Sequence, residues 1–175
     1  MIGLVKQDYN ENRKKYEKIR KELRKEIDKS IPIEQVGSTA IPSIHYGKNI
    51  IDILIGARNE EQFASIKKIL EDLNFVASKK SKDDIYQFFS STADETRSGD
   101  THSHLAIMDT ERYLEVLVLK NYLLANEKEA KEYSDLKVKL VHSGVTDRRE
   151  YKKSKSEYVS DLLKRAKENK KKNIL

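Results

Sequence analysis

The sequence contains no cysteine among its 175 residues. This absence excludes a disulfide framework and a zinc site built on thiolates, and it is compatible with a reducing compartment, so we expect a cytoplasmic protein. No run of apolar residues approaches the ~20 that a bilayer-spanning helix needs. The first residues also do not have the order of charged and apolar segments that is typical of a signal peptide. We therefore expect no membrane partner.

Charged and hydrophobic residues each make up 37% of the chain. Periodic apolar segments argue against disorder, and a chain of this length can bury a core without covalent staples. The formal net charge of +6 permits an anionic partner. Lys and Glu alternate along both expected terminal helices, however, and this pattern is typical of a solvated helix face. Nucleic-acid binding through these basic helices is therefore the less favoured interpretation of the charge. The sequence does not indicate an oligomeric state.

Apolar periodicity and capping residues predict five helices and five strands. The helices are expected over residues 8–29, 59–73, 110–126, 127–142 and 147–170. The strands are expected over residues 33–37, 49–55, 74–78, 84–90 and 102–108, with a polar connection over 91–101. This order predicts one α+β domain over 1–175, in which a small mixed β-sheet with flanking helices (1–109) precedes a C-terminal helical block (110–175).

A possible phosphate-binding turn follows the first expected strand, where residues 37–39 read Gly-Ser-Thr. Glycine allows close approach of the backbone, and hydroxyl and exposed N–H groups bind phosphate oxygens. Gly37, Ser38 and Thr39 are therefore candidate ligand-binding residues. The same residues also suit an ordinary turn.

The most apolar expected strand, "NIIDILI" at 49–55, contains a single carboxylate, Asp52. Ile50 and Leu54 share its face of the strand, where an unpaired charge is costly. Two interpretations follow. Asp52 is either a structural acid paired with Lys48 or a loop N–H, or a functional acid that faces a cation.

His102 and His104 lie two residues apart on the last expected strand, so both imidazoles point to one face. Such a pair binds a divalent metal or acts as acid and base near neutral pH. It also occurs as two half-exposed histidines with structural hydrogen bonds, and no third ligand is visible at a fixed spacing. Lys48 and Arg97 are nearby cations that suit an anionic substrate. On the expected strand 84–90, Tyr86 and Phe88 share a face and suit either stacking on a base or core packing.

Several of these motifs together resemble the GrpB family. The resemblance is carried by "IEQVGSTAIPSIHYGKNIIDILI" at 33–55, "THSHL" at 101–105, "YSDLKVKL" at 133–140 and "DRREYKKSKSEYV" at 147–159. It extends over nearly the whole chain. The chain departs from the family pattern where Gln35 replaces a His, Ser43 a Gly, Asn49 a Pro, and Leu119-Lys120-Asn121 a Phe-Arg-Asp.

The resemblance implies a mixed β-sheet of nucleotidyltransferase type. In that superfamily a Gly-Ser turn positions nucleotide phosphates, and two acids spaced by one residue, with a third on a later strand, hold Mg²⁺. Gly37 and Ser38 match the turn and Asp52 matches the first acid, whereas Leu54 stands where the second acid is expected. His102 and His104 stand on the strand of the third acid.

The resemblance therefore implies a small protein that binds a nucleotide or another phosphorylated ligand. Asp52, His102 and His104 would be catalytic residues and ligands of a divalent metal, Mg²⁺ or Mn²⁺, with Glu34 as a further ligand if the strand order brings it alongside. Ser38 and Lys48 would bind phosphate. The two functions that follow are metal-dependent nucleotidyl or phosphoryl transfer with a degenerate acid motif and, alternatively, a catalytically inactive ligand-binding or regulatory module.

Overall fold

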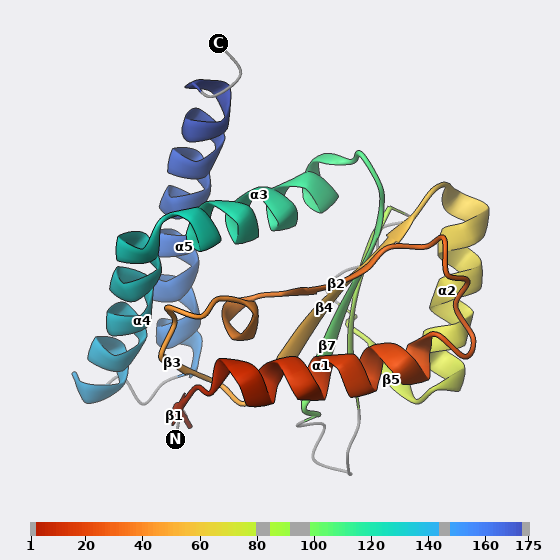
Figure 1. The fold of residues 1–175 in the computed structure, drawn as a ribbon, viewed down its shortest axis with the longest axis horizontal. Coiled ribbons are helices and arrows are strands. Elements are labelled where there is room, and N and C mark those ends of the chain that lie inside the picture. Colours follow the sequence, from red (N-terminus) through yellow and green to blue (C-terminus); the bar gives the residue numbers. More distant parts are fainter. Residues whose placement is uncertain (1–2, 80–84, 92–98, 144–147, 173–175) are drawn as a thin grey trace.

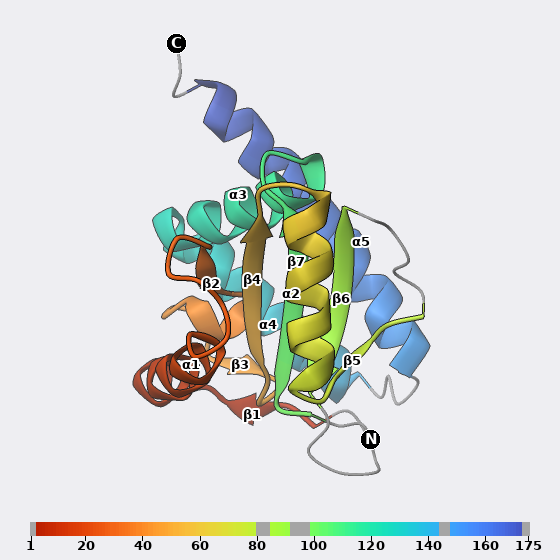
Figure 2. The same cartoon turned by 90° about the vertical axis from the view of Figure 1, so that its right-hand side faces the viewer.

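The structure, a computed structural model, describes residues 3–79, 85–91, 99–143 and 148–172. A mixed β-sheet lies at its centre, with helices on both faces (Figure 1). Figure 2 shows α2 in front of the sheet and α3, α4 and α5 behind it. The chain is therefore an α+β protein, as the sequence predicts.

The helices agree closely with the sequence prediction. They are α1 (Tyr9–Leu23), α2 (Glu60–Asp72), α3 (Glu111–Ala125), α4 (Glu127–His142) and α5 (Arg148–Lys172). Asn59 caps α2, since its side chain accepts a hydrogen bond from the backbone N–H of Gln62. Within the described ranges, none of these helices is both long enough and apolar enough to cross a membrane.

The first helix is shorter than the predicted range 8–29, because α1 ends at Leu23. The Arg24 guanidinium donates hydrogen bonds to the carbonyls of Asp28 and Ile31, at 2.6 and 2.7 Å. These bonds stabilise a tight turn in place of further helix. Ile27 and Ile31 are buried after the turn, at 2% and 5% exposure, so the apolar periodicity that predicts a longer helix reflects core burial and not helical backbone.

The central sheet contains five of the strands, in the order β2-β4-β7-β6-β5. They are β2 (Ile33–Val36), β4 (Ile51–Ala57), β5 (Phe75–Ala77), β6 (Tyr86–Ser91) and β7 (Thr101–Ile107). β4 and β7 are parallel and the other neighbours are antiparallel. Two short strands that the sequence analysis does not predict, β1 (Val5–Lys6) and β3 (Tyr46–Gly47), form a separate pair. Residues 92–98 of the expected polar connection lie outside the described residues.

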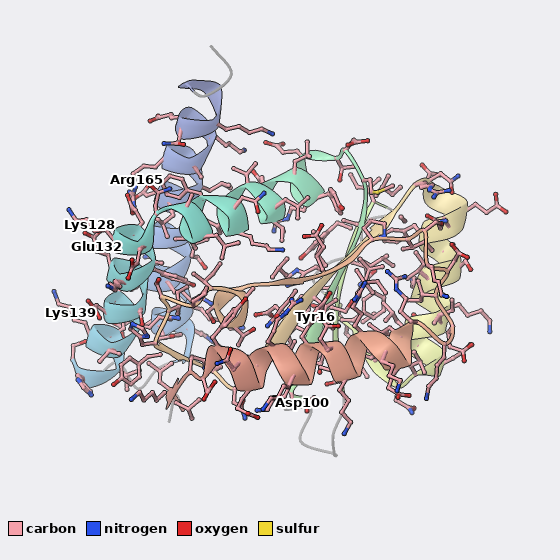
Figure 3. All side chains as sticks on the ribbon, viewed as in Figure 1. Tyr16, Asp100, Lys128, Glu132, Lys139 and Arg165 are labelled. Carbon is pink, nitrogen blue, oxygen red and sulfur yellow. The ribbon has the colours of Figure 1, made fainter. Side chains whose placement is uncertain are left out.

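The two faces of the sheet differ in how completely they are covered. On the face toward α1 and α2, Ile53, Ile55, Phe89 and Leu105 are fully buried. Tyr16 of α1 joins this core, and its hydroxyl donates to the Ile33 carbonyl at 2.7 Å; Figure 3 shows its place on the helix. The opposite face carries the alternate residues of β4, β6 and β7, several of which are only half-buried.

The segment that follows β2 connects the C-terminal helices with this second face of the sheet. A short 3₁₀ turn at Ser38–Ala40 leads into residues 41–44, and Ile41 and Ile44 pack against α4 and α5. The Ser134 hydroxyl of α4 accepts hydrogen bonds from the backbone N–H groups of His45 and Tyr46, at 3.1 and 3.0 Å. The turn between β2 and β4 is thereby attached to α4.

Candidate functional site

The parallel pairing of β4 with β7 places Asp52 directly beside His102. Their side chains point to the same face of the sheet, because paired residues of neighbouring strands share a face. His102 Nδ1 lies 3.2 Å from Asp52 Oδ1. The two side chains are 28% and 23% exposed, respectively. The site is therefore half-open to solvent.

His104 lies one pleat further along β7, opposite Leu54, and connects this site to β6. Its Nδ1 is 2.7 Å from the Tyr86 hydroxyl, and its Nε2 is 3.9 Å from Asp52 Oδ1. Burial raises the pKa of Tyr86, which keeps the phenol protonated at neutral pH. We therefore assign the phenol as donor to Nδ1, which leaves the His104 proton on Nε2, toward Asp52.

The charge of Asp52 is stabilised by both imidazoles. Burial by itself raises the pKa of Asp52, but the hydrogen bonds and charges of His102 and His104 outweigh it, and the pKa of this carboxyl lies well below its usual range. Asp52 is thus a carboxylate near neutral pH. Because Nδ1–H of His102 donates to this carboxylate, the His102 Nε2 keeps a lone pair that can accept a proton.

An aromatic ring completes this face of the sheet. Phe88 of β6 lies opposite His104. Its ring meets both imidazoles edge-on, with centroids 4.9 Å from His102 and 5.3 Å from His104. Phe88 is only half-buried, so it combines core packing with an accessible ring surface.

The Gly-Ser turn lies directly against Asp52. Gly37 has φ +70° and ψ −168°, and a Cβ built on it would lie 2.3 Å from Asp52 Oδ2. Only glycine fits this combination of backbone angles and close approach. Gly37 therefore allows the end of β2 to contact the carboxylate.

The other predicted phosphate-binding residues differ in where they lie and in how exposed they are. Ser38 is half-buried in the turn, and its hydroxyl lies near Gly47. Thr39 is only 2% exposed, so its side chain is withdrawn from solvent. Lys48 lies in the connection between β3 and β4, where its carbonyl accepts a hydrogen bond from Gln7. Arg97 lies outside the described residues.

On β2 and β4, the described residues of this face include two carboxylates, Glu34 and Asp52. Glu34 shares the face, but its Oε2 forms an ion pair with Lys120 of α3 at 2.8 Å. Leu54, at the position of the second acid, is buried with Val36, Ala106 and Tyr113.

No preformed metal centre is present in the described part of the chain, where no group of three or more His, Cys, Asp and Glu side chains is arranged to hold an ion. Mg²⁺ commonly takes one or two carboxylates together with substrate phosphates and water. The Asp52 carboxylate is a group of the kind that binds such an ion, and a metal at Asp52, with or without the two imidazoles, stays a prediction.

Two lysines that the sequence analysis does not single out also face this region. Lys137 of α4 is 3% exposed, and its Nζ lies 4.7 Å above the ring of Tyr133. Lys155 of α5 is half-buried, and the neighbouring Tyr133 raises its pKa. The charge of Asp52 acts on the pKa of both lysines. The signal in the sequence is a Lys at a core position of α4, four residues after Tyr133, where an apolar residue is expected.

Two surface hollows lie elsewhere. One follows α1 and is lined by charged residues such as Arg20 and Lys21. The other lies between residues 26–31 and α2. Neither hollow contains Asp52 or the histidines.

Comparison with known structures supports this fold. The crystal structure of conserved protein GrpB from Enterococcus faecalis superposes with a TM-score of 0.79 at 19% identity, covering 94% of this chain and 96% of that one. The Cid1 poly(U) polymerase, as the H336N mutant bound to MgATP, superposes with a TM-score of 0.54 at 12% identity. That match covers 82% of this chain and 46% of Cid1. The fold is therefore nucleotidyltransferase-like.

Comparison of sequences identifies the family. The family model described as GrpB protein matches residues 3–165. The Glutamate-rich protein GrpB of Alkalihalophilus pseudofirmus is 30% identical over 135 residues, which are 75% of this chain and 76% of that protein. The UPF0157 protein PA4798 of Pseudomonas aeruginosa is 30% identical over 134 residues, and the match spans 77% of this chain and about half, 54%, of that protein. The chain belongs to the GrpB family.

Proposed function

We propose that this protein binds a nucleotide or another phosphorylated small molecule on the half-open face formed by Asp52, His102 and Phe88, beside the Gly37-Ser38 turn. The observation that carries the proposal is the contact between Asp52 and His102, at 3.2 Å, directly against the glycine turn. Three segments far apart in the sequence meet there. An aromatic ring suits stacking on a base, an imidazole suits proton transfer, and a carboxylate suits a divalent ion that binds together with phosphates.

The chemistry that this arrangement supports is transfer of a nucleotidyl or phosphoryl group. In nucleotidyl transfer, an acceptor hydroxyl oxygen attacks the α-phosphorus, the bond to the pyrophosphate oxygen breaks, and pyrophosphate leaves. The hydroxyl proton passes to His102 Nε2, while Asp52 orients the imidazole and stabilises its charged form. A divalent ion, when bound with the phosphates, would neutralise their negative charge.

Titration with ATP, CTP, GTP and UTP in the presence of Mg²⁺ or Mn²⁺, followed by isothermal calorimetry, tests ligand binding. We expect at least one nucleotide to bind and Asp52→Asn to weaken that binding by tenfold or more. Asp72→Asn is the matched control, because Asp72 is exposed on α2, at the other face of the sheet. If no nucleotide binds the wild type, or if Asp52→Asn binds it as the wild type does, the proposal is wrong.

A second function, a catalytically inactive ligand-binding module, is favoured by one specific observation. Leu54 replaces the second acid and is 1% exposed within an apolar cluster, so packing has taken the place of a metal ligand. Nucleotide binding that persists in a chelator, without release of pyrophosphate or phosphate, supports this module over the transferase. Release that depends on added metal and on His102 supports the transferase. The cytoplasmic location expected from the cysteine-free sequence is part of either proposal.

A further inference from the structure

Four side chains of α4 and α5 form a polar group, which we name the α4–α5 lysine cluster: Lys137, Tyr133 and Tyr151, which are buried, and Lys155, which is half-buried. Tyr133 and Tyr151 are 7% and 3% exposed. Lys137, at 3% exposure, has no hydrogen-bond partner for its Nζ among the described residues. Within the described part of the chain, the charge of this ammonium group contacts the Tyr133 ring, 4.7 Å away. A buried ammonium group without an acceptor is costly, so this arrangement calls for an anion.

The position of the cluster on α4 directs it toward the Asp52 face. Lys137 lies three residues after Ser134 and four after Tyr133, on one side of the helix. Ser134 binds the backbone of residues 45 and 46, and Tyr133 packs with residues 40–44. These residues follow directly after the Gly37-Ser38 turn. The cluster therefore borders the turn that contacts Asp52.

The electrostatics of the cluster agree with this placement. Burial and the neighbouring charge of Lys155 lower the pKa of Lys137 to about 7, while Asp52 acts in the opposite direction. Tyr133, Asp52 and Tyr151 together raise the pKa of Lys155 against the effect of burial. Asp52 is the only carboxylate that acts on both lysines within the described residues. One carboxylate already bound by two histidines leaves the pair of cations incompletely neutralised.

We propose that the α4–α5 lysine cluster is an anion subsite, in which Lys137 and Lys155 bind the phosphate oxygens of the ligand whose remainder lies against Asp52, His102 and Phe88. This proposal rests on the function proposed above and names the part of the protein that recognises the phosphates. A diphosphate or triphosphate suits the subsite because two cations face one region. The Tyr133 hydroxyl orients Lys155 and supplies a further donor.

Inorganic pyrophosphate in a chelating buffer tests the subsite without a nucleoside and without metal. By isothermal calorimetry we expect the wild type to bind pyrophosphate, and Lys137→Met and Lys155→Met to bind it at least tenfold more weakly. Methionine preserves an unbranched apolar stem, so loss of a buried charge leaves the fold intact. Lys139→Met is the matched control, because Lys139 lies on the outward side of α4 (Figure 3). We expect it to bind within twofold of the wild type.

Proton uptake gives an independent readout. At pH 8 Lys137 is largely neutral in the free protein, and a bound anion favours its charged form, so binding takes up a proton. Asp52, Lys155, Tyr133 and Tyr151 face the same group and are unchanged in Lys137→Met. Calorimetry in buffers of different ionisation enthalpy should show this uptake in the wild type, and less of it in Lys137→Met.

The outcomes separate the subsite from the proposed function. Wild-type protein that does not bind pyrophosphate at millimolar concentration, or Lys137→Met that binds it unchanged, overturns the subsite. Nucleotide binding that depends on Asp52 but not on Lys137 overturns the subsite and leaves the proposed function standing. Pyrophosphate binding that depends on Lys137, without any nucleotide binding, supports the subsite and overturns the proposed function.

Discussion

Gly37 offers a sharp test of the site, because a single added methyl group meets the carboxylate on which the site is built. In Gly37→Ala the new Cβ would lie 2.3 Å from Asp52 Oδ2 and 2.9 Å from Asp52 Cγ. Neither distance is tolerated, so Asp52 or the turn must move. The backbone at φ +70° and ψ −168° is also in a region that alanine disfavours.

The expected cost has two parts. Backbone strain in this region contributes roughly 1–3 kcal/mol. Displacement of Asp52 weakens its hydrogen bond with His102, and bonds to charged groups contribute roughly 1.5–3 kcal/mol. Because the turn relaxes in part, we expect Gly37→Ala to lower the free energy of unfolding by about 2–5 kcal/mol. For a chain of this size, that loss corresponds to a decrease in Tm of roughly 5–15 °C.

Urea unfolding followed by circular dichroism measures this loss. Gly3→Ala is the control, since a Cβ at Gly3 meets nothing within 4 Å, and we expect its effect to stay within about 0.5 kcal/mol. A double-mutant cycle separates the two parts of the cost. In an Asp52→Ala background the carboxyl group is absent, so Gly37→Ala should retain the backbone strain and the 2.9 Å contact with Cβ of residue 52, but lose the contacts with Oδ2 and Cγ.

Two results would refute the reasoning. A loss below about 1 kcal/mol would mean that the turn does not hold Gly37 in its strained conformation. An equal loss with and without the Asp52 carboxyl group would mean that contact with this group is not the cause.

Three further predictions concern charge on the second face of the sheet. Lys137→Met should be more stable than the wild type by several kcal/mol at pH 6, since each unit of lowered pKa corresponds to about 1.4 kcal/mol. The difference in stability should shrink as pH rises from about 7, the pKa of Lys137 in the folded protein, toward the pKa of this lysine in the unfolded chain. Urea unfolding at pH 6 and pH 9 measures the difference. A difference that is equal at the two pH values would contradict the prediction. Asp52→Asn should be less stable than the wild type near pH 6. The stabilities of the two proteins should converge as pH falls below about 4, because a lowered pKa stabilises the folded state only while the carboxyl is charged. Unfolding of both proteins over an acid pH series tests this convergence, and parallel stability curves would exclude it. Leu54→Asp should cost about 3–5 kcal/mol because it buries an unpaired charge, whereas Leu54→Met should cost less than about 1.5 kcal/mol. Equal denaturant midpoints for the two variants would show that position 54 is not packed as described.

Much of the secondary structure was predictable because its signals are local. Asn59 caps α2 through its own side chain, and the alternation around His102 and His104 correctly indicates a strand with both imidazoles on one face. The helix prediction was wrong at residues 24–29, where Ile27 continues the helical spacing of apolar residues but the backbone is not helical. Periodicity reports which residues are buried, and burial there is achieved by a turn that Arg24 stabilises.

The candidate site was predictable only in its parts. Gly37, Asp52 and the histidines stand out by residue type, yet Asp52 and His102 are 50 residues apart in the chain. Their contact depends on β4 pairing with β7 in one register, with β5 and β6 added beyond it. Long-range pairing of this kind carries no local signal, because the free energy that selects it comes from the assembled sheet.

The sequence by itself determined most of the segments that form helices and strands, since spacing, caps and turn residues act within a few positions. It also determined which acid and which histidines were available for chemistry. The tertiary structure decided which of them meet, and it decided the character of Lys137. In the sequence this residue is a Lys at an expected core position of α4. In the fold it is a buried cation with no acceptor among the described residues, because α4 packs that side against the segment after the Gly37 turn. The burial of a residue depends on which other segments of the chain pack against it, and its neighbours in the sequence do not specify those segments.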